Sequence, residues 1–136
     1  MDNELEFLAK LGFELVGEWS LKLNCIDFQL QKHKDKTNIL YAFAVDKKVM
    51  YIGKSTQTLY KRMIGYKNPG PTQSTNINNN ARIHKILNDN RSVDIYVFIQ
   101  VEDYFYRGVK VNLAAGLENN LIGLFNSPWN NLGSSK

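Results

Sequence analysis

The chain has 136 residues, which suits one compact domain, and hydrophobic residues make up 43% of it, which excludes a wholly disordered protein. Its 17 Lys and Arg against 13 Asp and Glu give a net charge of +4, which permits a polyanionic partner without requiring one. No apolar run approaches the roughly 18 residues of a membrane span, and the acidic start of the chain is unlike a signal peptide. The single Cys25 excludes an internal disulfide framework and a four-cysteine zinc site. We therefore expect a soluble, cytoplasmic protein with no membrane partner.

The first 36 residues are expected to form an N-terminal extension made of a helix and short strands. Residues 3–11 fit a short helix with Asn3 as its N-cap, and Gly12 suits the position after its end. Residues 13–21 and 26–31 alternate imperfectly between apolar and polar side chains, which favours two strands. Because a charged, polar segment follows, we place a boundary there and expect a core domain over 37–136.

The core domain begins with the clearest strand pair in the sequence. Residues 39–45 and 49–53 are rich in β-branched and aromatic side chains, and a three-residue turn over 46–48 separates them. If the two strand ends face each other across this turn, residues of equal parity share a face of the sheet. The side chains that then project from one face are Tyr41, Phe43 and Tyr51. A four-residue loop would reverse this parity.

Two helices and a long polar segment come next. The pattern predicts a helix over 58–66, in which Arg62 and Tyr66 lie one turn apart. Residues 67–80 are polar and contain two prolines and a glycine, which indicates a loop, and loops of this length are often functional. The elements expected after it are a helix over 79–88, a strand over 93–101 and an irregular hairpin over 103–111 around Gly108.

The last predicted helix runs over 113–125 and ends before Pro128. Its leucines at positions 113, 117, 121 and 124 form the expected core row. Glu118 lies on the flank of this row, where a carboxylate must be ion-paired, hydrogen-bonded, bound to a metal or turned out to solvent. A helix-edge glutamate that simply reaches water explains the residue equally well.

In combination these residues resemble the GIY-YIG nuclease family, and most closely its small restriction-endonuclease-type members. The two signature elements stand as Ile39-Leu40-Tyr41 and Tyr51-Ile52-Gly53, and the residues that follow them are Lys54-Ser55, Leu59 and Arg62. Glu118 and then Pro128-Trp129-Asn130 come at family-like intervals. The first element lacks the family's Gly and Ile. Tyr66 stands where many members carry His, although some restriction enzymes carry Tyr there.

The resemblance implies an α+β fold with a small, mainly antiparallel three-stranded central sheet flanked by helices. It implies a catalytic site built from Tyr41, Tyr51, Arg62, Tyr66, Glu118 and Asn130. Glu118 would hold one Mg²⁺ or Mn²⁺ ion, and Arg62 would donate to the phosphate oxygens. Tyr41 would activate or orient the attacking water, although a phenol is a poor base unless the cation and the arginine lower its pKa. The resemblance assigns the supporting roles to Tyr51, Tyr66 and Asn130.

Seven further side chains are candidate DNA contacts. Those near the implied site are Lys54, Ser55, Lys61 and Lys67. Those in the 67–80 segment are Gln73, Thr75 and Asn76. Lysines can meet DNA phosphates, although surface solubility explains each of them nearly as well. The polar side chains of the segment can hydrogen-bond base edges, with a plain surface excursion as the competing interpretation.

The sequence therefore predicts a divalent-metal-dependent endonuclease that hydrolyses phosphodiester bonds of double-stranded DNA, of the site-specific restriction type. Because each chain has one active centre, cutting both strands favours a homodimer. Three alternatives stay open: a structure-specific repair or recombination nuclease of the same family, a non-catalytic nucleic-acid-binding module, and a protein-interaction domain that binds no nucleic acid. His33 and His84 match no family position and are interpreted as surface residues.

Overall fold

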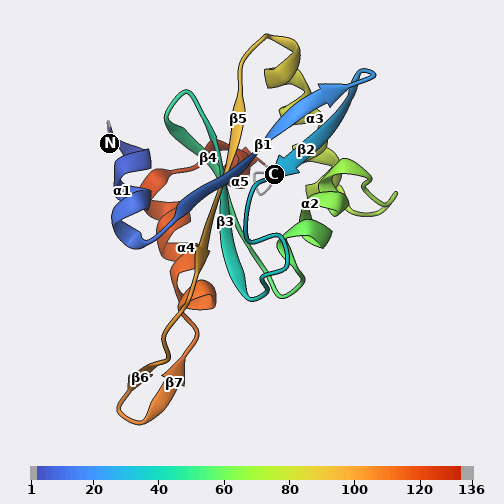
Figure 1. The fold of residues 1–136 in the computed structure, drawn as a ribbon. Helices are drawn as coiled ribbons and strands as arrows, with labels where there is room; N and C mark the ends of the chain where they lie inside the picture. Colours follow the sequence, from blue (N-terminus) through green and yellow to red (C-terminus); the bar gives the residue numbers. More distant parts are fainter. Residues whose placement is uncertain (1–2, 133–136) are drawn as a thin grey trace.

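The computed structural model describes residues 3–132 (Figure 1). In chain order its elements are α1 (Glu4–Leu11), β1 (Glu14–Lys22), β2 (Cys25–Leu30), β3 (Ile39–Val45), β4 (Lys48–Ser55), α2 (Leu59–Lys67), α3 (Ser74–Asn88), β5 (Val93–Ile99), β6 (Tyr104–Tyr106), β7 (Val109–Val111), α4 (Leu113–Phe125) and α5 (Pro128–Leu132). No helix within this part of the chain has the length and apolar character needed to cross a bilayer.

Five antiparallel strands form the central sheet in the order β2-β1-β5-β3-β4. The α+β class and the antiparallel pairing agree with the sequence prediction, whereas the prediction of three strands is wrong. The N-terminal hairpin adds the other two strands because β1 pairs along β5, and Val16 and Trp19 of β1 are buried in the core. Alternation within residues 13–21 indicated a strand but not its partner. The boundary after residue 36 stays an interpretation of the sequence, since both parts contribute to one sheet.

Helices cover both faces of this sheet, and each face has its own hydrophobic cluster (Figure 1). One cluster contains Met63 of α2 and Trp129 of α5. The other contains Leu8 of α1 and Leu121 of α4. The edge strand β4 therefore lies between two helical layers, and side chains from either layer can reach it.

The turn between β3 and β4 has two residues rather than the predicted three. Asp46 and Lys47 occupy it with φ values of 51° and 69°, and Val45 pairs directly with Lys48. Positive φ at both central residues is what the tight hairpin turn of type I′ requires. The predicted loop length is therefore wrong by one residue.

A register shift further along β3 compensates for the shorter turn. It lies between Phe43 and Ala44, and beyond it Tyr41 faces Gly53 and Phe43 faces Tyr51. These are the pairs that the three-residue loop predicted. The prediction that the three aromatic side chains share a face is therefore confirmed, and all three pack in the cluster of the α2 side.

The helix ends follow local capping rules in part. Thr58 caps α2, since its side chain accepts a hydrogen bond from the Lys61 backbone N–H at 3.1 Å. Gly12 ends α1 with a left-handed φ of 109°, as predicted. Asn3 occupies the predicted N-cap position of α1, but its side chain makes no capping hydrogen bond.

The predicted loop over 67–80 is wrong from residue 74 onward, because α3 already begins at Ser74. The amide side chains that suggested a loop make tertiary contacts instead. Asn79 is fully buried, and Asn80 Nδ2 donates to the Tyr66 carbonyl at 2.8 Å. Asn80 therefore uses its amide to bind α2 rather than its own backbone, whereas the buried Nδ2 of Asn79 has no hydrogen-bond partner among the described residues.

α4 spans the predicted range, and three of the four predicted leucines face the core. Leu121 is buried, and Leu113 and Leu117 are half-buried and pack against the same cluster. Leu124 is 49% exposed, so the expected row is wrong at that position, and Ala114 and Phe125 are buried beside the other three. The helix is turned so that Glu118 lies beside the sheet edge with its side chain 22% exposed.

The hairpin β6–β7 protrudes from the body beyond α4 (Figure 1). It confirms the hairpin predicted around Gly108, and among the described strands β6 and β7 pair only with each other. Its base is held by the Gln100 side chain, which donates to the Glu102 and Val111 carbonyls and accepts from the Leu113 N–H. The arm is therefore an ordered projection.

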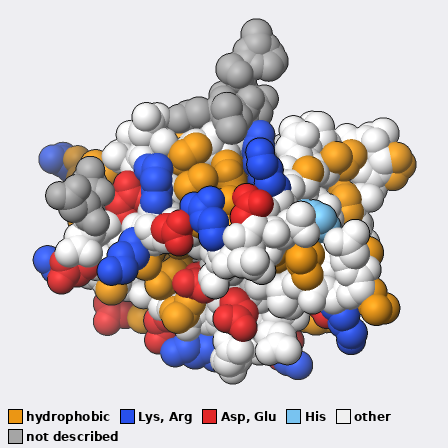
Figure 2. Space-filling model, turned by 90° about the horizontal axis from the view of Figure 1, so that it is seen from above, with side chains coloured by type: hydrophobic (Ala, Val, Ile, Leu, Met, Phe, Trp, Pro, Cys, Tyr) orange, Lys and Arg blue, Asp and Glu red, His pale blue; other side chains and the backbone are white. Residues whose placement is uncertain are grey.

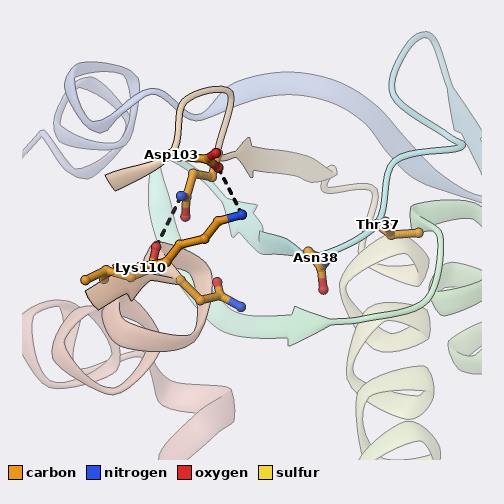
Figure 3. Close-up of a pocket in the computed structure, with 7 residues that line it drawn as sticks. Thr37, Asn38, Asp103 and Lys110 are labelled. Atoms are coloured by element: carbon orange, nitrogen blue, oxygen red, sulfur yellow. Dashed lines mark hydrogen bonds and ion pairs between the residues drawn. The ribbon is translucent and has the colours of Figure 1, made fainter. Parts of the chain in front are cut away.

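A pocket of about 440 Å³ lies at the base of this arm (Figure 3). An ion pair of 3.3 Å between Asp103 and Lys110 joins the two limbs of the hairpin there. Thr37 and Asn38 line the pocket from the segment before β3. Because its only charged side chains neutralise each other, this pocket offers no net charge to a ligand.

Candidate active site

Two tyrosines from different elements meet inside the core. The hydroxyl of Tyr41, on β3, lies 2.6 Å from that of Tyr66, on α2, and the two residues are 1% and 0% exposed. The rings of Trp19 and Phe43 pack against the Tyr66 ring edge to face. Packing therefore fixes the position of both hydroxyls.

Arg62 extends this pair into a hydrogen-bond chain. Its Nη2 donates to Tyr66 Oη at 2.8 Å, and its guanidinium carbon lies 4.1 Å from the centre of the Tyr66 ring. A guanidinium can only donate, so Tyr66 accepts from Arg62 and has its own proton available for Tyr41. In that order, the proton of Tyr41 is free to point at a water or a phosphate oxygen.

The charge states follow from burial and from these neighbours. Burial raises the pKa of Tyr41 above its ordinary value, and Tyr51 adds to the rise while Arg62 opposes it. Burial, followed by the charge of Tyr41, likewise raises the pKa of Tyr66 well above its ordinary value. For Arg62, burial acts to lower the pKa, but the two phenols outweigh it and leave the pKa above its usual range. Both phenols are therefore neutral, and the guanidinium is charged, at neutral pH.

Tyr51 and Gly53 form the neighbouring wall on β4. The ring of Tyr51 lies 6.2 Å from that of Tyr41, measured between centroids. A Cβ at position 53 would lie 2.5 Å from Tyr41 Oη and 2.9 Å from a ring carbon of Tyr51, which is closer than side chains tolerate. Gly53 is therefore required for the Tyr41 hydroxyl to occupy its position.

Asn130 closes the outer edge of β4. Its Oδ1 accepts from the Ile52 N–H at 2.8 Å, its Nδ2 donates to the Ile52 carbonyl at 2.9 Å, and Ser127 Oγ donates to the same Oδ1. The amide thus takes the place of a neighbouring strand at this residue. The family resemblance implied a supporting role for Asn130, and the structure shows which backbone groups it binds.

Glu118 reaches the same stretch of β4 from the α4 side of the sheet. Its Oε1 lies 3.8 Å from Lys54 Nζ, next in sequence to Gly53. Within residues 3–132, Glu118 makes no hydrogen bond or ion pair with Tyr41 or Arg62. The tyrosines and the carboxylate therefore approach residues 51–54 from opposite faces of the edge strand.

The similarity of the whole chain to a solved structure decides the fold. The structure of the E118A mutant of EndoII from bacteriophage T4 matches it with a TM-score of 0.72 and 26% identity, over 96% of this chain and 99% of that chain. The chain shares the fold of the GIY-YIG nucleases. A second GIY-YIG nuclease, the restriction endonuclease Hpy188I in complex with product DNA, matches with a TM-score of 0.56 and 20% identity, over 91% and 82% of the two chains. No protein-family model and no curated protein sequence matches the chain.

The predicted DNA contacts of this chain fall into two groups. The first group pairs outside the two pockets that hold the others: Lys54 with Glu118, Ser55 with Gln57, and Lys67 with Asp27. Ser55 is buried and its hydroxyl stabilises a turn, so it is a structural residue here. The Lys67 amine, 3.0 Å from Asp27, lowers the pKa of that carboxyl.

The other four predicted contacts line two pockets beside the tyrosines. Lys61, Gln73 and Asn76 share an open pocket of about 590 Å³ with Arg62. Thr75 lies in a pocket of about 230 Å³ with Tyr51 and Asn130. Figure 2 shows Lys and Arg interspersed with Asp and Glu on the face seen there, so net charge alone does not mark a DNA surface on that face. The two pockets indicate a candidate binding surface more specifically than net charge does.

Sequence reasoning missed Arg82, which lines the smaller pocket. Its Nη1 donates to Asn79 Oδ1 and to the Trp129 carbonyl, both at 3.0 Å. A single arginine on a polar helix carries no spacing signal that would have singled it out. His33 and His84 bind Glu14 and Asn24 respectively, away from the tyrosines.

Proposed function

We propose that the chain is a divalent-metal-dependent endonuclease that hydrolyses phosphodiester bonds of double-stranded DNA. The observation that carries the proposal is the hydrogen-bond chain from Arg62 through Tyr66 to Tyr41, on a fold shared with GIY-YIG nucleases. A half-buried guanidinium beside aligned hydroxyls suits a phosphate that must be held and polarised. The DNA-bound state of Hpy188I supports DNA as the partner, by likeness of fold.

Arg62 and Tyr41 would divide the work at the scissile phosphate. Arg62 lines the open pocket, where its remaining N–H groups can donate to the non-bridging oxygens. Tyr41 keeps its proton at neutral pH, because burial raises the pKa of its phenol. We infer that Tyr41 orients the attacking water or a phosphate oxygen, and that it does not act as a free phenolate. Tyr51 and Tyr66 would keep the phosphate and Tyr41 aligned.

Glu118 suits a divalent cation as the one protein ligand. Mg²⁺ is commonly held by one or two carboxylates, with waters and substrate phosphates as its other ligands. Among residues 3–132 no group of three His, Cys, Asp or Glu side chains could hold a metal. When bound, such a cation stabilises negative charge on the phosphate. Lys54, which now pairs with Glu118, would then be free to meet a DNA phosphate.

We propose site-specific, restriction-type cutting, with structure-specific repair or recombination cutting as the alternative. Amide side chains such as Gln73 and Asn76 beside Arg62 support the first, because amides can read base edges in a groove. The site would then combine a fixed phosphate position with side chains able to discriminate bases.

We also propose that two copies of the chain associate through the β6–β7 arm. The exposed large apolar side chains there are Val101, Tyr104, Phe105, Tyr106 and Val109. A lone two-stranded hairpin is marginal in water, which favours a partner for it. The charged residues of this segment are Glu102, Asp103, Arg107 and Lys110. Equal numbers of both signs suit a self-complementary contact between identical copies better than a contact with DNA phosphates.

Digestion of a supercoiled plasmid tests the catalytic proposal. Wild type should nick and linearise it with Mg²⁺ and leave it intact with EDTA. Arg62→Ala and Glu118→Ala should each cut at least about 100-fold more slowly while still binding DNA. Arg91→Ala is the matched control, because Arg91 is an exposed arginine paired with Asp46 at the β3–β4 turn.

Two outcomes of this digestion would contradict the proposal. If wild type and Glu118→Ala bind DNA equally and neither nicks it, the chain is a binding module. If wild type cuts but yields a smear on a mixed-sequence plasmid, the site-specific part is wrong and the endonuclease part stands.

A further inference from the structure

A second arginine lies beside the candidate site in a pocket of its own. The pocket of about 230 Å³ is lined by Tyr51, Ser74, Thr75, Asn78, Arg82, Trp129 and Asn130. These seven residues include one cation and no carboxylate. Hydroxyl and amide groups from the first turns of α3 supply further hydrogen-bonding capacity. The chemistry of the lining suits an anion.

The Arg82 side chain is held in place with most of its donors unused. Its Nη1 donates to Asn79 Oδ1, within a fully buried residue, and to the Trp129 carbonyl. Of the five N–H donors of a guanidinium, those on Nη2 and Nε bind no other described residue. Burial lowers the pKa of Arg82, and nearby Tyr51 opposes this shift, so the guanidinium stays charged. A fixed, charged guanidinium with three further N–H donors thus lines the pocket.

This pocket adjoins the scissile position without being part of it. Tyr51 and Asn130 contribute to its wall, while Arg62 lines the other pocket. The two pockets use different sides of the first turns of α3, since Ser74, Thr75 and Asn78 line one and Gln73 and Asn76 line the other. Tyr51 lines the Arg82 pocket, and its ring lies 6.2 Å from that of Tyr41, so the pocket adjoins the tyrosine cluster. An anion site beside the cluster suits a neighbouring phosphate on the same strand.

We propose that the pocket around Arg82 binds the phosphate next to the scissile one on the cleaved strand, with Arg82 as its anion-binding residue. The proposal rests on the proposed function and names a substrate contact beyond the residues of the family resemblance. Arg82 would also link that contact to the edge of β4. It donates to the carbonyl of Trp129, and the next residue, Asn130, binds the Ile52 backbone in β4.

Binding to duplexes with single uncharged phosphates tests this assignment. The proteins carry Glu118→Ala, so that binding is measured without cleavage. In each duplex one phosphate of the cleaved strand is replaced by a neutral methylphosphonate. Arg82→Gln should weaken binding of the unmodified duplex about tenfold and reduce the salt dependence by about one phosphate contact. Arg82→Lys should restore part of the loss, and Arg91→Gln should change nothing.

The decisive result is the coupling between protein and DNA changes. For the protein with Arg82, a methylphosphonate next to the scissile position should weaken binding as much as the Arg82→Gln substitution weakens binding of the unmodified duplex. For the Arg82→Gln protein, the same methylphosphonate should cause no further loss. If the losses instead add at every position, or thermal unfolding shows that Arg82→Gln destabilises the fold and weakens all duplexes alike, Arg82 is structural and the inference is wrong. If the protein with Arg82 binds no duplex, the proposed function fails with it. If it binds and Arg82→Gln binds equally, only the inference fails.

Discussion

The hydroxyls of Tyr41 and Tyr66 lie 2.6 Å apart in the core, although the two residues are 25 positions apart in the sequence. This contact joins β3 to α2. Because Tyr66 also accepts a hydrogen bond from Arg62, it links the guanidinium to the Tyr41 hydroxyl. The Tyr66 hydroxyl is hydrogen-bonded to both Arg62 and Tyr41. The Tyr66 oxygen is therefore the link on which the proposed phosphate site depends.

We expect Tyr66→Phe to slow cleavage about 100-fold and to cost on the order of 1 kcal/mol of stability, because the buried Tyr41 hydroxyl loses this hydrogen bond. The ring still packs against Trp19 and Phe43, whereas the link between Arg62 and Tyr41 is lost. Single-turnover cleavage rates and thermal unfolding measure the two effects. Tyr66→His, which keeps a hydrogen-bonding group one turn after Arg62, should recover part of the rate. Tyr104→Phe, on the exposed hairpin, is the control. An unchanged rate in Tyr66→Phe would remove the link from the mechanism.

Tyr66 also makes the stability of the protein depend on alkaline pH. Its folded-state pKa lies above the unfolded value of about 10, so the folded state keeps a proton that the unfolded state loses. The stability that this retained proton contributes is fully present below the unfolded-state pKa of about 10. It is lost as the pH rises from about 10 through the folded-state pKa. Each such phenol adds a slope on the order of 1 kcal/mol per pH unit to the free energy of unfolding.

We therefore expect Tyr66→Phe to lose stability less steeply than wild type above pH 10. Urea unfolding between about pH 8 and pH 11 measures the free energy of unfolding of both proteins. Lysine titration affects both equally, so the difference in slope isolates the phenol. Parallel curves across this range would contradict the raised pKa of Tyr66.

The sequence was sufficient to place the aromatic face of the site. Alternation along β3 and β4 predicted that Tyr41 and Tyr51 share a face, and the structure agrees. It agrees for a reason that the sequence did not show, since a two-residue turn and a register shift at Phe43 cancel each other. The predicted pairing was therefore right although the turn length that it assumed was wrong.

The contacts that the sequence missed depend on side-chain direction and long-range pairing. The polar start of α3 has the composition of a loop, and the sequence does not show that α2 packs beside it. In the structure, the Asn80 amide donates to the Tyr66 carbonyl of α2. The core row of α4 was wrong at Leu124, where the buried residue is Phe125, because leucine spacing alone does not fix the rotation of a helix. The Arg82 pocket forms only when α3, β4 and α5 come together, and no local pattern encodes that meeting.

Asn130→Ala should loosen the edge strand and reduce cleavage together. It leaves the N–H and carbonyl of Ile52 without their partners, which costs about 2 kcal/mol for groups at a partly buried edge. Thermal unfolding should shift by several degrees, and hydrogen exchange at the Ile52 amide should become faster. Asn119→Ala, at an exposed position of α4, is the matched control. Unchanged exchange at Ile52 would show that Asn130 does not hold the strand in solution.

The hairpin arm gives the prediction that bears on double-strand cutting. Replacing Phe105 and Tyr106 by Glu places two negative charges on side chains that are 63% and 65% exposed, so the fold of a single copy should be unaffected. In an interface between two arms the same charges would be buried, and association should be lost. Sedimentation at micromolar concentration should show a dimer for wild type and a monomer for the variant.

The same arm variant should separate nicking from linearisation. Each monomer keeps Tyr41, Arg62 and Glu118, so single-strand nicks should form at close to the wild-type rate, while linear plasmid should accumulate far more slowly. Leu23→Glu changes a residue that is 92% exposed at the β1–β2 turn, and it should leave both association and linearisation unchanged. A monomeric wild type that still linearises the plasmid in one binding event would show that the two cuts do not need a second copy.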